Sequence, residues 1–167
     1  SQTIVSATFK EADEVMTPLL GGKPLTEYIF VDAADKAKMK QADHDLRQTH
    51  ITQPAVLSVD ESLTRMMAAF GVKPDMVMGH SLGEYSALVA AGALPFKEAL
   101  KAVSARGTEM TKVSVEDNGL MAACFGPLDE IKKIIESIDG YVVIANINSY
   151  SQAVIGGATP GVKKAVE

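Results

Sequence analysis

A serine flanked by glycines at the end of a short apolar run, in "MVMGHSLGEY", is the residue best suited to chemistry in this sequence. A strand that turns at once into a helix strains the residue at the bend, and glycines at 79 and 83 would let strand and helix approach closely. The pattern therefore predicts that Ser81 is an exposed nucleophile. The N–H of Leu82, at the helix N-terminus, could stabilise a negatively charged oxygen. The simpler alternative is a turn that only connects a strand to a helix.

Arg106, in the segment "AVSARGTEM", is a second candidate functional residue. Its neighbours in the predicted helix are small or apolar, so a guanidinium that faces inward could bind a substrate carboxylate through two hydrogen bonds. From the pattern alone, the more ordinary interpretation is a surface arginine, or an ion pair with Glu109 three residues along the helix.

A serine nucleophile requires a base within hydrogen-bonding distance, and histidines are the first candidates. The sequence has three, His44, His50 and His80. His80 is predicted to leave the turn in another direction and support it, and the other two are predicted to be exposed in or near a charged connection. None is a convincing base, so the base is expected to be an acidic residue reached through space, or a residue outside this sequence.

The elements that would position these residues divide the chain into segments 1–115 and 116–167. The first segment is predicted to be part of an α/β unit, with a parallel sheet flanked by helices and the serine at the carboxyl end of a strand. Pro54 is expected in the first turn of its helix, and the charged segment 32–48 is interpreted as a solvated helix or connection. Apolar spacing predicts helices near 7–16, 52–70, 82–91 and 95–110, and a strand at 76–78.

The second segment, 116–167, has a different pattern. Strands are predicted in "LMAACF", "YVVIANI" and "QAVIGG", with one helix between the first two and another after Thr159. This β-α-β-β-α order predicts a ferredoxin-like α+β unit that lacks its final strand, and the active-site cleft is expected between the two units.

Composition excludes several classes of partner. A net charge of -5 argues against nucleic acid, which needs a basic surface, and the longest apolar stretch is too short to cross a bilayer. The single cysteine, Cys124, fits a reducing compartment and predicts a cytoplasmic protein. Neither a metal-ligand cluster nor a dinucleotide or phosphate loop is visible, so no metal and no bound cofactor is predicted.

The segments "GVKPDMVMGHSLGEYSALVAAGAL", "ALKAVSARGTEM" and "ANINSYSQAVIGG" together resemble the malonyl-CoA:acyl carrier protein transacylases, the acyltransferase family of fatty acid, polyketide and polyunsaturated fatty acid synthases. The resemblance implies that Ser81 takes a malonyl group from coenzyme A as an ester and passes it to the phosphopantetheine thiol of an acyl carrier protein. It also implies that Arg106 holds the free carboxylate of malonyl.

The same resemblance implies weaker roles for three residues. Gln53 matches the glutamine of the family's "TQPA" segment near the acyl pocket, His80 the histidine beside the nucleophile, and Asn148 a polar residue facing the cleft. Leu82, where some synthase domains have Gln, favours malonyl over methylmalonyl. The charged insert before Gln53 resembles multidomain synthases, so other synthase domains are expected as partners.

Two features of the family have no counterpart in this sequence. The family's first strand with its Gly-Gln-Gly oxyanion loop is expected to precede residue 1, and its catalytic histidine to follow residue 167. The chain is therefore expected to be a core fragment with little activity of its own. An esterase or thioesterase of α/β-hydrolase type, or a carrier-protein docking module with an unused serine, remain the alternatives.

Overall fold

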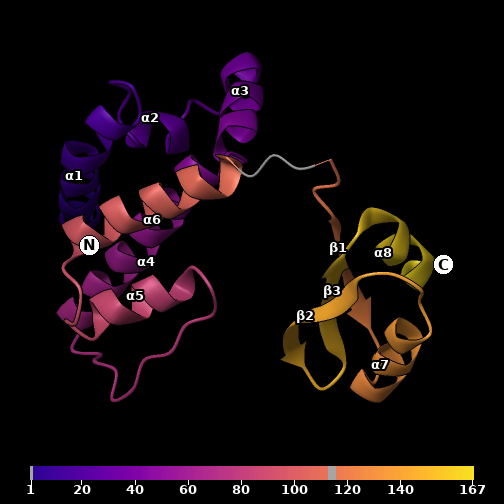
Figure 1. Cartoon of the computed structure of the whole chain (residues 1–167). Helices are drawn as coiled ribbons and strands as arrows, with labels where there is room; N and C mark the ends of the chain where they lie inside the picture. The colour runs from indigo at the N-terminus through magenta and orange to yellow at the C-terminus, as the bar shows by residue number, and fades with distance from the viewer. Residues whose placement is uncertain (1, 113–115) are drawn as a thin grey trace. The chain divides into compact units, whose positions relative to one another are not determined.

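Two compact units make up the computed structural model, Ser1–Lys112 and Val113–Glu167 (Figure 1). The structure describes residues 2–112 and 116–167, so the end of the first predicted segment, at residue 115, lies outside the described residues. The described part of the first unit is helical. Its helices are α1 (Gln2–Leu19), α2 (Thr26–Ile29), α3 (Lys36–Leu46), α4 (Thr49–Ala69), α5 (Gly83–Ala90) and α6 (Phe96–Lys112).

Helices α1, α4 and α6 pack against one another around the core of the first unit. Most of the core side chains are aliphatic, as the low aromatic content of the sequence predicts. Because α4 carries Gln53 and α6 carries Arg106, this core also fixes the two helices that bear candidate site residues. The buried apolar side chains are Ala12, Met16, Leu25, Tyr28, Ile51, Ala55, Leu57, Phe96, Ala99, Leu100 and Val103.

The start of α4 differs from the prediction. The helix begins at Thr49, a turn before Pro54, so the expectation that this proline lies in the first turn is wrong. A proline in the second turn cannot donate to the carbonyl of His50, which costs one helical hydrogen bond. Packing of α4 into the core outweighs this local cost, because burial of an apolar face supplies most of a helix's stability in a folded protein.

The parallel sheet predicted for the first unit is not formed by the described residues. Residues 76–78 form no strand, and the side chains of Met76 and Met78 are 91% and 93% exposed. A strand requires a neighbour that accepts and donates backbone hydrogen bonds. The described residues place sheet strands only in the second unit, so the apolar run before the serine has no ladder to join. Apolar composition predicts a strand, but it cannot supply the partner.

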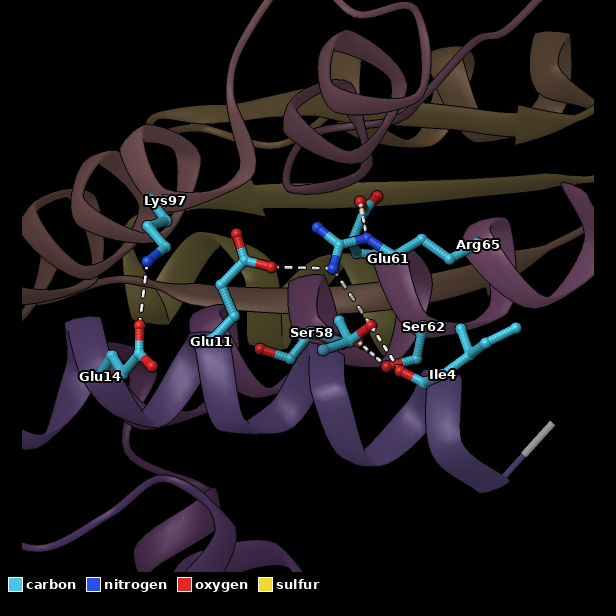
Figure 2. A network of polar contacts seen from close by, with 9 residues as sticks. Ile4, Glu11, Glu14, Ser58, Glu61, Ser62, Arg65 and Lys97 are labelled. Carbon is cyan, nitrogen blue, oxygen red and sulfur yellow. Dashed lines mark hydrogen bonds and ion pairs between the residues drawn. The ribbon is translucent and has the colours of Figure 1, made fainter. Parts of the chain in front are cut away.

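An ion-pair network joins α1 to α4 (Figure 2). Arg65 on α4 donates through Nε to Glu61 (2.6 Å) and through a terminal nitrogen to Glu11 of α1 (2.8 Å). Its guanidinium also lies 5.2 Å from the centre of the Phe96 ring of α6. Burial alone would lower the pKa of Arg65, but the hydrogen bonds to Glu11 and Glu61 more than reverse this and raise the pKa, so the cation is retained where the three helices meet.

A second ion pair, also drawn in Figure 2, joins α6 to α1. Lys97 donates to Glu14 over 2.9 Å. This hydrogen bond lowers the pKa of Glu14 and raises the pKa of Lys97. Both side chains are largely exposed, so the pair fixes little of the fold by itself.

The second unit has the predicted β-α-β-β-α order. The strands pair in the order β1-β3-β2, with both pairs antiparallel, so β3 is the central strand. Ile131, Ala153, Ile155 and Val162 form a separate small core between the sheet and the helices. The elements are β1 (Leu120–Phe125), α7 (Leu128–Glu136), β2 (Val142–Ser149), β3 (Gln152–Gly157) and α8 (Thr159–Val166).

A carboxylate fixes the start of α8. Asp117 accepts hydrogen bonds from the backbone N–H of Thr159 (2.8 Å) and from its hydroxyl (2.6 Å), and also from the N–H of Gly119 (2.9 Å). These bonds, chiefly that from the Thr159 hydroxyl, lower the pKa of Asp117. Because an ionised carboxylate is stabilised at a helix N-terminus, Asp117 ties the segment before β1 to the last helix of the unit.

Candidate active site

The turn that carries Ser81 is strained, as the sequence predicts. Ser81 has φ 54°, the only positive φ of a non-glycine residue in the described part of the chain. A Cβ atom at position 79 would lie 2.0 Å from the carbonyl oxygen of Gly83, so only glycine fits at the first flanking position. A Cβ at position 83 would meet no atom within 4 Å, and the expectation that this second glycine is needed for close approach is therefore wrong.

The bend leads directly into α5, which begins at Gly83. The first backbone bonds of this turn run from the N–H of Gly83 to His80 (3.0 Å) and from the N–H of Glu84 to Ser81 (3.2 Å). The N–H of Leu82 precedes these bonds, at the end of the helix where N–H groups have no intrahelical partner. A hydroxyl and a candidate donor for an oxyanion thus come from adjacent residues of one turn.

Arg106 faces this turn from α6. One terminal nitrogen of its guanidinium donates to the hydroxyl oxygen of Ser81 (3.0 Å), and the other donates to the side-chain oxygen of Gln53 on α4 (2.8 Å). The alternative pairing with Glu109 does not occur, because Glu109 pairs with Lys112 (2.6 Å). The structure therefore brings together three of the residues singled out in the sequence, each from a different element.

Gly107 sets how closely α6 approaches α4 beside this group. A Cβ atom at position 107 would lie 2.7 Å from the Cα of His50 and 2.7 Å from the carbonyl oxygen of Thr49. Both are backbone atoms, which cannot turn aside as a side chain can. The absence of a side chain at 107 thus allows Arg106, the preceding residue, to reach Gln53.

Two further contacts support the site, and sequence patterns alone do not identify them. The side-chain nitrogen of Gln53 donates to the Sδ of Met110 over 3.6 Å. The hydroxyl of Ser86 on α5 donates to Asp60 on α4 over 2.6 Å, which anchors the helix after the bend. Met110 lies on the same side of α6 as Val103 by its spacing of seven residues, although Met110 is 54% exposed while Val103 is buried, and that spacing is the one sequence signal for the contact.

Comparison with known families identifies the family of this chain. The acyl transferase domain family matches the chain over residues 2–167. This chain belongs to the acyl transferase domain family. The malonyl CoA-acyl carrier protein transacylase of Bacillus subtilis (strain 168) is 37% identical to this chain over 163 residues, which are 95% of this chain and 47% of that protein.

The chain also resembles solved structures of malonyl transacylases. The MCAT from Streptococcus pneumoniae superposes with a TM-score of 0.79 and 36% identity, over 98% of this chain and 50% of that one. A malonyl-transacylase in complex with its type II PKS acyl-carrier protein gives a TM-score of 0.80 at 32% identity, over 98% of this chain and 50% of that one. The chain therefore spans about half the length of the relatives it matches.

The other predicted residues take no part in the hydrogen bonds between Ser81, Arg106 and Gln53. His80 is exposed beside the bend, and Asn148 is exposed on β2 of the second unit. His44 is exposed on α3, as predicted, but His50 is half-buried because its backbone packs against Gly107. Among the described residues, Arg106 is the side chain that bonds the Ser81 hydroxyl, and no histidine does.

The described residues offer neither a metal site nor a membrane-spanning helix. Residues 2–112 and 116–167 contain no cluster of three or more His, Cys, Asp or Glu side chains placed to hold a metal ion. In the same described part, no helix combines the length and the apolar character needed to cross a membrane. Cys124 is half-buried in β1, with its sulfur 3.9 Å from the carbonyl oxygen of Ala122.

Proposed function

We propose that this chain supplies the nucleophile and the carboxylate-binding residue of a malonyl-CoA:acyl carrier protein S-acyltransferase. The single observation that carries the proposal is the contact of the Arg106 guanidinium with both Ser81 and Gln53. Malonyl has one methylene between its thioester carbonyl and its carboxylate. A cation within hydrogen-bonding distance of the nucleophile therefore suits an acyl group of this length, charged at its far end.

In the first step, the Ser81 oxygen attacks the thioester carbonyl of malonyl-CoA and loses its proton to a base. The resulting oxyanion accepts hydrogen bonds from backbone N–H groups at the bend, that of Leu82 among them. Collapse of the intermediate breaks the C–S bond, releases coenzyme A as the thiol after protonation, and leaves malonyl as an ester on the serine. Arg106 holds the malonyl carboxylate throughout, in a charge-assisted pair.

In the second step, the phosphopantetheine thiol of an acyl carrier protein attacks this ester and regenerates the serine hydroxyl. The structure of a malonyl-transacylase in complex with an acyl-carrier protein supports a partner of this class. We extend this role to fatty acid or polyketide synthesis, with other synthase domains as further partners. Gln53 positions Arg106, while His80 and Asn148 are proposed to face the substrate.

Activity of the chain alone is expected to be low. The Ser81 hydroxyl needs a base to become a strong nucleophile. Within the residues that the structure describes, its bonded side chain is a guanidinium, which donates and cannot accept a proton. The base is proposed to come from outside this chain, so acylation of Ser81 should be detectable but slow.

The test is intact-mass spectrometry after long incubation of the chain with malonyl-CoA. We expect a malonyl adduct that is absent in Ser81→Ala and moves to the thiol of added holo-acyl carrier protein. A parallel incubation with acetyl-CoA, which lacks the carboxylate, should give less adduct. Equal labelling by both donors, with the acyl group passing to water rather than to the thiol, would instead favour an esterase or thioesterase.

A further inference from the structure

The amide of Gln53 is held between two residues of α6 that lie one helical turn apart. Its oxygen accepts from Arg106 (2.8 Å), and its nitrogen donates to the sulfur of Met110 (3.6 Å). Side chains four residues apart on a helix lie on the same face, one above the other. The two contacts therefore come from one side of α6 and enclose the amide.

The two neighbours select the same orientation of this amide. Gln53 is only 4% exposed, so protein groups rather than solvent decide which way it points. A guanidinium only donates, which requires the amide oxygen to face Arg106. A thioether is a weak acceptor, which suits the amide nitrogen. The opposite orientation would set N–H groups against the guanidinium and leave the amide oxygen against sulfur.

We propose that Met110 is a positioning residue of the acyltransferase site. Its sulfur fixes the Gln53 amide, and the amide oxygen then fixes one nitrogen of the Arg106 guanidinium. The other nitrogen is thereby aimed at Ser81, where the substrate carboxylate must be held. This inference rests on the proposed function of Arg106, and it adds Met110 as the group that keeps the arginine in place.

The packing of α6 on α4 makes this arrangement possible. Gly107 lies between Arg106 and Met110 in the chain and contacts the α4 backbone at Thr49 and His50. Gln53 follows these residues by one turn of α4, so it projects beside the point of closest approach. The Met110 sulfur reaches the amide because the two backbones are this close, and α6 thus holds the amide from both sides.

The test compares two variants of this chain in acylation by malonyl-CoA and by acetyl-CoA. Met110→Leu keeps the volume but removes the acceptor, and we expect the malonyl-to-acetyl ratio to fall about two- to tenfold, the range for one neutral hydrogen bond. Met110→Gln restores a stronger acceptor and should keep the ratio within about twofold of the parent chain. Met39→Leu, on the exposed helix α3, is the matched control and should change nothing.

A second measurement reads the contact itself. In nuclear magnetic resonance spectra of the same chains, the side-chain NH₂ signals of Gln53 should shift in both Met110 variants, and in Met110→Leu they should exchange faster with solvent. Unchanged Gln53 signals in Met110→Gln would overturn the proposal even if Met110→Leu did not fold. Equal loss of malonyl preference in both variants would also overturn it, because Met110 would then act by shape alone.

The two measurements separate this inference from the proposed function. If the parent chain shows no preference for malonyl, the role of Arg106 in binding the carboxylate fails. The Gln53 signals still decide whether the sulfur holds the amide. If the preference is present and Met110→Leu retains it, the proposed function stands and the positioning role of Met110 is rejected.

Discussion

The guanidinium of Arg106 donates a hydrogen bond to the hydroxyl oxygen of Ser81 over 3.0 Å. This bond uses a lone pair of the serine and leaves the hydroxyl proton free to be donated to a base. It also places a cation close enough to the nucleophile for a short acyl group to bond both. A bound carboxylate would compete for the same guanidinium nitrogen and release the serine oxygen for attack.

Replacement of Arg106 by Ala should abolish the preference for malonyl. A charge-assisted hydrogen bond contributes about 1.5–3 kcal/mol, which corresponds to roughly 10- to 100-fold in the malonyl-to-acetyl ratio. Arg106→Lys should recover only part of this ratio, because an ammonium cannot bond Ser81 and Gln53 with a planar fork. The ratio is measured by intact mass on Ser81.

The control for this prediction is Arg47→Ala. Arg47 is exposed and pairs with Asp43 at the end of α3, so its loss removes the same charge outside the site. A fall in the ratio equal to that of Arg106→Ala would attribute the effect to net charge and contradict the prediction.

The two glycines around Ser81 should differ sharply when each is replaced by alanine. Gly79→Ala places a Cβ 2.0 Å from the backbone at Gly83, so the bend must shift, at a cost of about 1–3 kcal/mol or more in the free energy of unfolding. Gly83→Ala, at the first residue of α5, meets open space and should stabilise by about 0.4–1 kcal/mol, because alanine lowers the conformational entropy of the unfolded chain. Denaturant unfolding of the two variants measures both changes in the free energy of unfolding. Equal destabilisation by Gly79→Ala and Gly83→Ala would count against the observed bend.

Gly107→Ala should loosen the contact between α6 and α4. The added Cβ would meet the backbone of Thr49 and His50 at 2.7 Å, and overpacking of this kind costs about 1–3 kcal/mol in the free energy of unfolding. Malonyl preference should fall in the same variant, because Arg106 is carried away from Gln53. Denaturant unfolding measures the stability, and acylation measures the preference.

The exposed neighbour Glu109 provides the comparison on the same helix. Glu109→Ala removes a surface pair with Lys112 and should change the free energy of unfolding by less than about 0.5 kcal/mol. If Gly107→Ala lowered the free energy of unfolding no more than Glu109→Ala, the close approach of α6 to α4 would not be required for stability.

The stability of the second unit should fall in acid through Asp117. Its pKa is lowered in the folded state by the hydrogen bonds from Thr159 and Gly119. Its contribution to stability is therefore full above the unfolded pKa, about 3.9, and is lost as the pH falls through the lower folded pKa. Unfolding followed by the Ile155 methyl signals at pH 6 and pH 3 should show this loss.

Asp117→Asn keeps an acceptor oxygen but cannot titrate in this range, so it isolates the charge. The variant should be less stable than the parent chain at pH 6, and the difference should shrink at pH 3. A constant difference between the two chains at both pH values would mean that the Asp117 charge does not stabilise the start of α8.

Much of the local structure could be predicted from the sequence. The bend at Ser81 and the β-α-β-β-α order of the second unit are encoded in glycine positions and in apolar spacing, which act between residues close in the chain. The interpretation of α4 failed at Pro54, where a local rule about proline was outweighed by packing of the whole helix. The predicted strand at 76–78 failed because a strand depends on a partner that local composition does not contain.

The sequence by itself determined the bend at Ser81 and the positions of most of the helices, because these follow from backbone preferences and apolar spacing over a few neighbouring residues. Only the tertiary structure decided that Arg106 bonds Ser81 and Gln53 rather than Glu109, that Gln53 also bonds Met110, and that a Cβ atom at position 107 would meet the α4 backbone. These relationships join residues on different helices. They arise from how α4, α5 and α6 pack. The apolar periodicity of one helix shows which face is buried, but it does not specify which side chain of another helix that face will contact.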